Sequence, residues 1–202
     1  ILALGKTPTE QVQADVYLMT DERPALLPVP VVRNGMSLTH SAPATESLLE
    51  DGRSQSDLRQ GVTLEVMGEG ESMGPLSDSM KTIARSLQGD VKYDITWTTL
   101  GGYLDTLVAR GISTNVASFV GATTVREHVV GWDDRAASAD ELARMQQLVR
   151  EAMEEGALGV GSSLIYAPAA YASTDELVAL CEAASPYGGM YISHLRSEGD
   201  RL

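Results

Sequence analysis

The chain has 202 residues, of which 43% are hydrophobic and 21% charged, and this composition predicts a packed core rather than general disorder. Its 15 lysines and arginines against 28 aspartates and glutamates give a formal charge of −13, which excludes nucleic acids and anionic membranes as expected partners. No apolar run approaches the roughly 20 residues that span a bilayer, and the single cysteine, Cys181, fits a reducing, cytoplasmic compartment and a buried place in a helix.

Residues 1–38 differ from the rest of the chain. Pro24, Pro28 and Pro30 interrupt short apolar runs there, which limits any strand to an edge or a short piece. We interpret 1–38 as an irregular or β-rich segment that would represent the remnant of a small β domain, and we expect no helix before about Glu46. Because the chain begins with Ile1 and lacks the basic start of a signal peptide, we expect it to begin inside a longer reading frame or after processing.

From Gly61 onward, strand and helix patterns alternate. The expected strands are 61–68, 93–98, 115–120, 158–161 and 190–193, and the expected helices are 79–87, 99–110, 139–155 and 177–184. Capping boxes at Ser138–Glu141 and Ser173–Glu176 introduce the last two helices. The alternation predicts parallel βαβ units, in a doubly wound sheet or a (β/α) barrel. A complete eight-stranded barrel takes about 250 residues, so a barrel over 39–202 would be partial.

Ligands of parallel α/β proteins gather beyond the carboxyl ends of the strands. The first clear strand is followed by Gly68-Glu69-Gly70-Glu71-Ser72, where glycines let two carboxylates approach a cation; a solvated acidic turn is the alternative. The last strand is followed by His194, which fits a metal ligand or a general base and equally a hydrogen-bonded structural histidine. His40 would stand at the end of a first strand, whereas His128 has the surroundings of a helix surface.

Four blocks of the sequence resemble the N-acyl-D-amino-acid deacylases, the D-aminoacylase family of the metal-dependent amidohydrolases. They are 61–76 (through Gly-Glu-Gly-Glu-Ser-Met-Gly-Pro-Leu), 118–126, 156–174 and 189–199 (Gly-Met-Tyr-Ile-Ser-His-Leu-Arg-Ser-Glu-Gly), and the likeness runs from about Ser47 to Leu202. The resemblance implies a (β/α)8 barrel beside a small β-sandwich and one or two divalent metals, usually zinc. It also implies hydrolysis of the amide of a small N-acyl-D-amino acid by metal-activated water, with a carboxylate that moves the proton.

The same resemblance assigns roles to residues. His194 falls on a metal-ligand histidine, and Tyr166 and Arg196 are assigned to substrate binding. The family's metal-bridging position falls on Glu69 or Gly70, depending on which side the block is anchored, and we choose Glu69 because a carboxylate can bridge metals and glycine cannot.

Three departures from the family pattern bear on activity. His40 is the third candidate ligand, but Ala42 stands where the family's His-x-His pair has its second histidine. The family's later metal histidine and catalytic aspartate would follow Leu202, so no catalytic residue is assigned. We therefore expect an incomplete chain that is inactive by itself, or alternatively a non-catalytic half-barrel subunit that associates with itself or a partner through open sheet edges. An unrelated α/β protein whose acidic loop binds a cation is a third interpretation.

Overall fold

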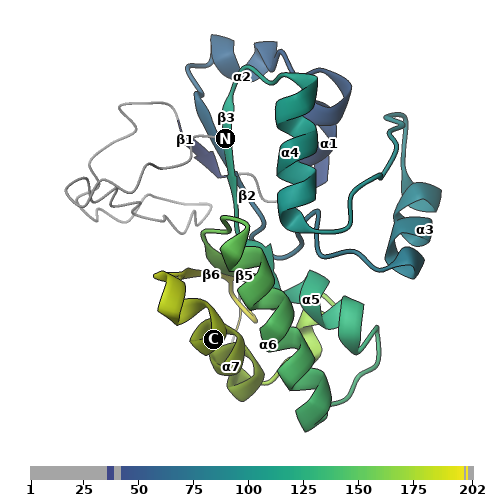
Figure 1. The fold of residues 1–202 in the computed structure, drawn as a ribbon, viewed down its shortest axis with the longest axis vertical. Coiled ribbons are helices and arrows are strands. Elements are labelled where there is room, and N and C mark those ends of the chain that lie inside the picture. Colours follow the sequence, from purple (N-terminus) through teal and green to yellow (C-terminus); the bar gives the residue numbers. More distant parts are fainter. Residues whose placement is uncertain (1–35, 39–41, 198, 200–202) are drawn as a thin grey trace.

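The computed structural model describes residues 36–38, 42–197 and 199, with side chains from Glu46 onward (Figure 1). Its strands are β1 (Met36–Leu38), β2 (Leu64–Met67), β3 (Asn115–Ser118), β4 (Val120–Gly121), β5 (Gly159–Ser163) and β6 (Met190–His194). Its helices are α1 (Ala42–Glu50), α2 (Gln55–Arg59), α3 (Asp78–Leu87), α4 (Leu100–Arg110), α5 (Ala122–Val129), α6 (Ala139–Glu154) and α7 (Thr174–Ala184). Short 3-10 turns lie at Ala169–Tyr171 and Ser185–Tyr187.

All the strand pairs are parallel, as the alternating pattern predicts. β1, β2 and β3 form one group in that order, and β4, β5 and β6 form another. Only Phe119 separates β3 from β4, and its amide donates to the Met67 carbonyl at 2.8 Å. The Leu158 amide donates to the Ser118 carbonyl at 2.9 Å, so the two groups form one continuous parallel surface.

The expected strand ends are confirmed, with two extensions. β2 ends at Met67, within one residue of the expected end at 68, and β3 and β4 end at Ser118 and Gly121, on either side of the expected end at 120. β5 and β6 run beyond their expected ends, to Ser163 and His194. The carboxyl ends of these parallel strands therefore carry the residues selected for chemistry, and His194 is the last residue of a strand rather than the first residue of a loop.

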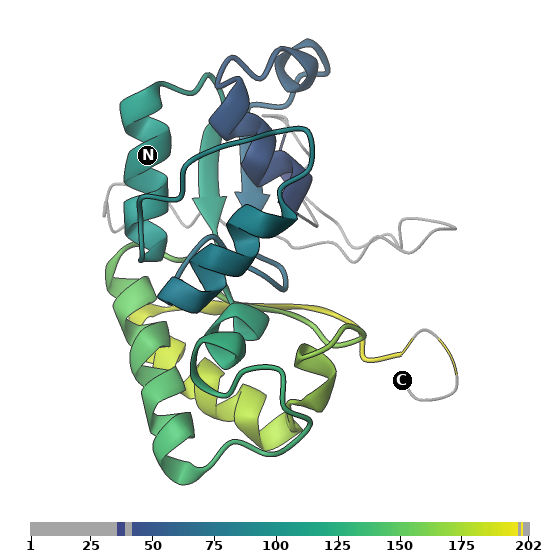
Figure 2. The same ribbon diagram turned by 90° about the vertical axis from the view of Figure 1, so that its right-hand side faces the viewer.

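The two faces of this surface are buried in different ways. Side chains that alternate along the strands point to opposite faces, and Met67, Val120 and Val160 join the main core formed with the helices. Figures 1 and 2 show α4 beside the first strand group and α5, α6 and α7 beside the second. The opposite face holds a smaller cluster centred on Phe119 and Ile192. His194, two residues after Ile192, shares this second face.

Side-chain caps explain where α6 and α7 start, and one of the two capping predictions needs correction. At α6 both halves of the box form, because the Glu141 amide donates to Ser138 Oγ at 3.2 Å and the Ser138 amide donates to the Glu141 carboxylate at 2.7 Å. At α7 the Ser173 hydroxyl accepts from the Glu176 amide at 3.1 Å, but the second half is wrong. The Glu176 carboxylate instead accepts from Arg126 at 2.7 Å, because a buried cation is the stronger partner.

Two further element predictions are wrong. Among the described residues, no strand pairs with the expected strand Tyr93–Thr98. Its carbonyls accept from other groups: the side chains of Arg85 and Gln88 bind two of them, and the Leu76 amide binds the carbonyl of Thr98. Helix α1 begins at Ala42, four residues before the expected start near Glu46, because a proline is tolerated in the first helical turn.

The amino-terminal interpretation falls mostly outside the described residues. Residues 1–35 and His40 are not among them, whereas residues 36–38 form β1 and pair with β2 in parallel. In the described part of the chain, no helix has the length and apolar character needed to cross a membrane.

Candidate functional site

The acidic loop, residues 68–72, crosses the face of the sheet that lies opposite the main helical core. A Cβ atom at Gly161 would lie 2.1 Å from the Gly68 carbonyl oxygen, and one at Gly121 would lie 2.4 Å from the Gly70 carbonyl oxygen. Real Cβ atoms do not approach backbone oxygens this closely. The loop therefore rests directly on β4 and β5, and glycines at these two strand positions are what make that contact feasible.

The loop approaches the strand neighbour of His194. Ser163, the last residue of β5, is paired in register with His194 on β6. A Cβ atom at Gly70 would lie 2.3 Å from Ser163 Oγ, so the middle of the loop packs against this residue. The acidic loop thus packs on β5, the strand adjacent to the one that carries His194, at the same carboxyl edge.

Tyr166 joins His194 at this edge. The centroids of the two rings lie 6.1 Å apart with an interplanar angle of 20°, which is a stacked arrangement. Tyr166 remains 58% exposed, so its ring forms the outer rim beside the imidazole. The structure therefore brings together the predicted metal ligand and one of the two predicted substrate contacts.

The loop geometry distinguishes its three central residues. Gly70 has no room for a side chain against Ser163. Glu71 lies toward α5, and partial burial, followed by repulsion from Glu127, raises the pKa of its carboxyl. Glu69 lies over β5, since its carbonyl oxygen is 2.8 Å from where a Cβ atom of Gly161 would be. Of Glu69 and Glu71, Glu69 is therefore the residue whose backbone packs on β5, the strand adjacent to β6.

Arg196 has partners of its own in the structure. Its guanidinium donates to the carbonyls of Ala170 and Ala172, at 3.1 and 2.9 Å. The Ala170 amide in turn donates to the Tyr166 carbonyl at 2.8 Å. Arg196 therefore braces the segment that carries Tyr166, two residues after the strand end that carries His194.

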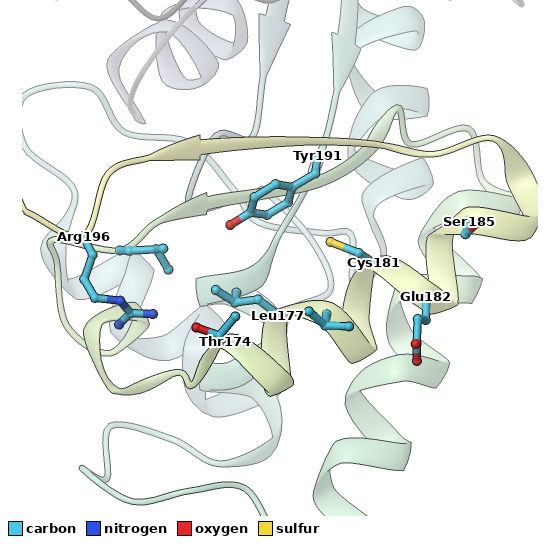
Figure 3. Close-up of a pocket in the computed structure, with 9 residues that line it drawn as sticks. Thr174, Leu177, Cys181, Glu182, Ser185, Tyr191 and Arg196 are labelled. Carbon is cyan, nitrogen blue, oxygen red and sulfur yellow. The ribbon is translucent and has the colours of Figure 1, made fainter. Parts of the chain in front are cut away.

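A pocket of about 540 Å³ lies between α7 and β6 (Figure 3). It is lined by Leu164, Thr174, Leu177, Val178, Cys181, Glu182, Ser185, Tyr191 and Arg196. Tyr191 precedes Ile192 on the strand and so points to the opposite face from His194. The pocket is therefore separate from the strand-end site. Cys181 is half-buried there, and burial raises the pKa of its thiol, which fits the expected structural role in a helix.

The described residues supply only part of a metal site. A catalytic zinc ion normally has three protein ligands and an open position for water. Among the residues described by the structure, no three His, Cys, Asp or Glu side chains are grouped so that they could hold a metal ion. Glu69 and His194 have the right donor atoms but are two, and His40 is outside the described residues. His128 lies on α5 as expected, with Nδ1 3.3 Å from the Pro75 carbonyl oxygen.

Sequence reasoning missed the residues that hold the acidic loop in place. The Ser72 amide donates to Thr124 Oγ1 at 2.8 Å, and Ser163 packs against Gly70. Ser72 and Thr124 both lie within the blocks that carry the family resemblance, in 61–76 and 118–126. Their place in these two blocks could have marked them as candidates, but nothing in the sequence indicates that the two blocks are in contact.

Comparison with known proteins identifies deacylases of N-acyl-D-amino acids among the relatives, although no protein-family model matches the chain. A D-aminoacylase of Alcaligenes xylosoxydans xylosoxydans is 36% identical over 149 residues, which cover 72% of this chain and 30% of that protein. An N-acyl-D-aspartate deacylase of the same organism is 35% identical over 145 residues, covering 71% of this chain and 29% of that protein. The chain thus spans about three-tenths of the length of these relatives.

Solved structures agree with the fold. A D-aminoacylase studied for its binuclear metal centre matches with a TM-score of 0.72 and 31% identity, over 83% of this chain and 35% of that one. An N-acyl-D-glutamate deacylase from Bordetella bronchiseptica, complexed with zinc and a phosphonate mimic of the tetrahedral intermediate, matches with a TM-score of 0.69 and 27% identity. The partial parallel barrel is confirmed, and metal centres are a property of both of these solved relatives.

Proposed function

We propose that this chain, which belongs to the N-acyl-D-amino-acid deacylase family of metal-dependent amidohydrolases, supplies one part of the barrel and active site of an enzyme that hydrolyses the amide bond of an N-acyl-D-amino acid. The observation that carries the proposal is the meeting of the acidic loop, His194 and Tyr166 at one carboxyl edge of the parallel strands. This edge is where parallel barrels place their catalytic groups.

The chain's own residues suggest a division of tasks. His194 and Glu69 offer an imidazole nitrogen and a carboxylate, which are donors that zinc accepts. Tyr166, exposed on the rim, offers a flat ring for the acyl group and a hydroxyl that can donate to a substrate carbonyl or carboxylate. Two donors among the described residues do not complete a zinc site, so the remaining ligands and the group that moves the proton must come from elsewhere.

The 202-residue chain is therefore expected to show no deacylase turnover when it is purified and given zinc. Loss of general acid–base help alone typically costs about 10²–10⁴-fold in rate, and an incomplete ligand set would weaken metal binding further. Zinc-dependent hydrolysis of N-acetyl-D-amino acids by this chain, abolished by His194→Ala, would contradict this expectation.

A chimera tests the function directly. Residues 47–202 would replace the matching portion of the Alcaligenes D-aminoacylase, and hydrolysis of N-acetyl-D-amino acids and their L counterparts would be measured. We expect activity on the D substrates that is lost in His194→Ala and kept in the matched control His128→Ala. A folded chimera that is inactive, or one that survives His194→Ala, would refute the proposal; exchange of 156–199 alone serves if the larger chimera does not fold.

A non-catalytic half-barrel subunit is the second candidate, and the pocket between α7 and β6 favours it. Val178 and Tyr191 line this pocket and are each more than 40% exposed. Apolar side chains gathered in this way mark surfaces that other chains cover. Light scattering on the purified chain would decide: a stable dimer that Val178→Asp converts to a monomer supports this candidate, and a monomer at all concentrations opposes it.

A further inference from the structure

We propose that Ser72 and Thr124 are positioning residues that hold the acidic loop in a single place against the first turn of α5. The inference rests on the proposed function, because it concerns the loop that carries the candidate ligand Glu69. Neither side chain is expected to touch substrate or metal; both act through the position of the loop.

Four hydrogen bonds join the two segments or tighten the loop. The Ser72 amide donates to Thr124 Oγ1 at 2.8 Å, and the Thr124 hydroxyl lies 3.3 Å from the Ser72 carbonyl oxygen, to which it donates. The Gly121 amide donates to Ser72 Oγ at 2.9 Å, and the Ser72 hydroxyl donates to the Gly74 carbonyl at 2.6 Å. One serine thus uses its amide, its carbonyl and its hydroxyl to fix the end of the loop.

The loop also replaces the missing cap of α5. The N-cap residue is Gly121, which has no side chain to accept from the first-turn amides. The Gly70 carbonyl accepts from the Thr123 amide at 3.2 Å in its place. The partial positive charge at a helix N-terminus also favours a nearby acidic segment. The loop carbonyl and the helix amide therefore satisfy each other.

Close packing also holds the acidic loop in place. Thr124 is only 3% exposed, so water cannot easily replace its hydroxyl. The carbonyl oxygens of Gly70 and Gly68 also pack directly against Gly121 and Gly161. Removing the Thr124 hydroxyl would leave the part-buried Ser72 amide without this acceptor, which is unfavourable as long as the loop stays in place. Opening the loop toward water is the least costly way to relieve that penalty.

Amide hydrogen exchange on the full chain tests the proposal without metal or substrate. Thr124→Val removes the hydroxyl at nearly constant shape, and Thr124→Ser keeps it. We expect exchange of the Ser72 amide to accelerate at least about tenfold in Thr124→Val, the equivalent of 1.4 kcal/mol, and to stay near wild type in Thr124→Ser. Ser72→Ala should accelerate exchange of the Gly121 amide, and it serves as the second variant if Thr124→Val folds poorly.

Thr114→Val is the matched control for a general loss of stability. Thr114 is also 3% exposed, and its hydroxyl donates to Glu65 at 3.0 Å, but it precedes β3 at the opposite end of the strands. This variant should leave exchange in residues 68–72 unchanged. The proposal is overturned if Thr124→Val leaves the Ser72 amide protected, if Thr114→Val exposes it equally, or if Thr124→Ser behaves like valine. An inactive chimera would refute the proposed function and leave this exchange result standing, so the two failures are distinguishable.

Discussion

A buried ion pair between Arg126 and Glu176 joins the helices that pack beside the site. Arg126 Nη1 lies 2.7 Å from a Glu176 carboxylate oxygen, with the two side chains 1% and 5% exposed. Arg126 also donates to the carbonyls of Asp133 and Arg135, so it joins α5, the following loop and α7. We predict that Glu176→Gln, which keeps the shape and removes the charge, destabilises the chain severely.

The magnitude follows from the burial of the cation. Breaking one partner of a buried pair costs about 3–5 kcal/mol, because the remaining charge stays in a medium of low polarity. Glutamine can still accept one hydrogen bond from Arg126, so the lower end, about 3 kcal/mol, applies. For a chain of this size each kcal/mol lowers the melting temperature by about 2–4 °C, and the expected fall is about 6–12 °C. The pair of Arg135 and Glu141 is screened by solvent, so its loss should destabilise the chain far less.

Urea unfolding followed by circular dichroism would measure this cost, with Glu141→Gln as the matched exposed control. A double variant, Arg126→Met with Glu176→Leu, should recover much of the loss, since an apolar replacement of both partners is often neutral or stabilising. A loss below about 1 kcal/mol in Glu176→Gln, or a double variant that is no better than the single one, would refute the reasoning.

Three further predictions concern charge and packing. Burial raises the pKa of the Glu65 carboxyl, so its favourable contribution is complete below the unfolded pKa of 4.5 and is lost as pH rises through the folded pKa. Glu65→Gln should therefore gain stability relative to wild type as pH rises above 4.5 in unfolding experiments, and a pH-independent difference would oppose this. The Arg135 side chain lowers the pKa of Glu141 to about 2, so Glu141→Gln should cost stability at pH 7 and lose that effect as pH falls from 4.5 toward 2 in unfolding experiments. Gly161→Ala should cost about 1–3 kcal/mol through its clash with the loop carbonyls, whereas Gly89→Ala, with open space around its Cβ position, should be near neutral in the same assay.

Sequence patterns predicted the parallel strands well because glycines and turn residues bound each apolar run. The same patterns failed at Tyr93–Thr98 for a physical reason. Tyr93, Ile95 and Trp97 do alternate toward the interior, and Trp97 packs against Tyr103 with ring centroids 5.3 Å apart. Alternation reports an extended chain with one buried face. It does not report whether a neighbouring strand exists, and here side chains bind the carbonyls instead.

The candidate site was predicted in part. His194 was selected because it follows the last predicted strand, where a metal ligand, a general base and a structural histidine fit equally, and Tyr166 came from the resemblance. The structure places the two side by side, and their roles stay predictions. The family's metal-bridging position falls on Glu69 or on Gly70, depending on which end of the block is aligned first. Spacing alone could not decide between the two residues. Only the three-dimensional contact between Gly70 and Ser163 shows that no side chain fits at Gly70. Arg196 was assigned to substrate, whereas its two carbonyl partners depend on a fold-back that no local pattern reveals.

The most direct test of the account is the kcat/KM of the chimera on N-acetyl-D-amino acids after Glu69→Gln and, separately, after Glu71→Gln. Both variants remove one carboxylate from the same loop, so they are matched in charge and in sequence context. The account predicts that Glu69→Gln lowers kcat/KM by at least about a hundredfold, as expected when a group central to the chemistry is lost, and that Glu71→Gln stays within about tenfold of the parent. Loss of activity in Glu71→Gln with Glu69→Gln unaffected, or no loss in either, would contradict the claim that Glu69 and His194 serve one active site.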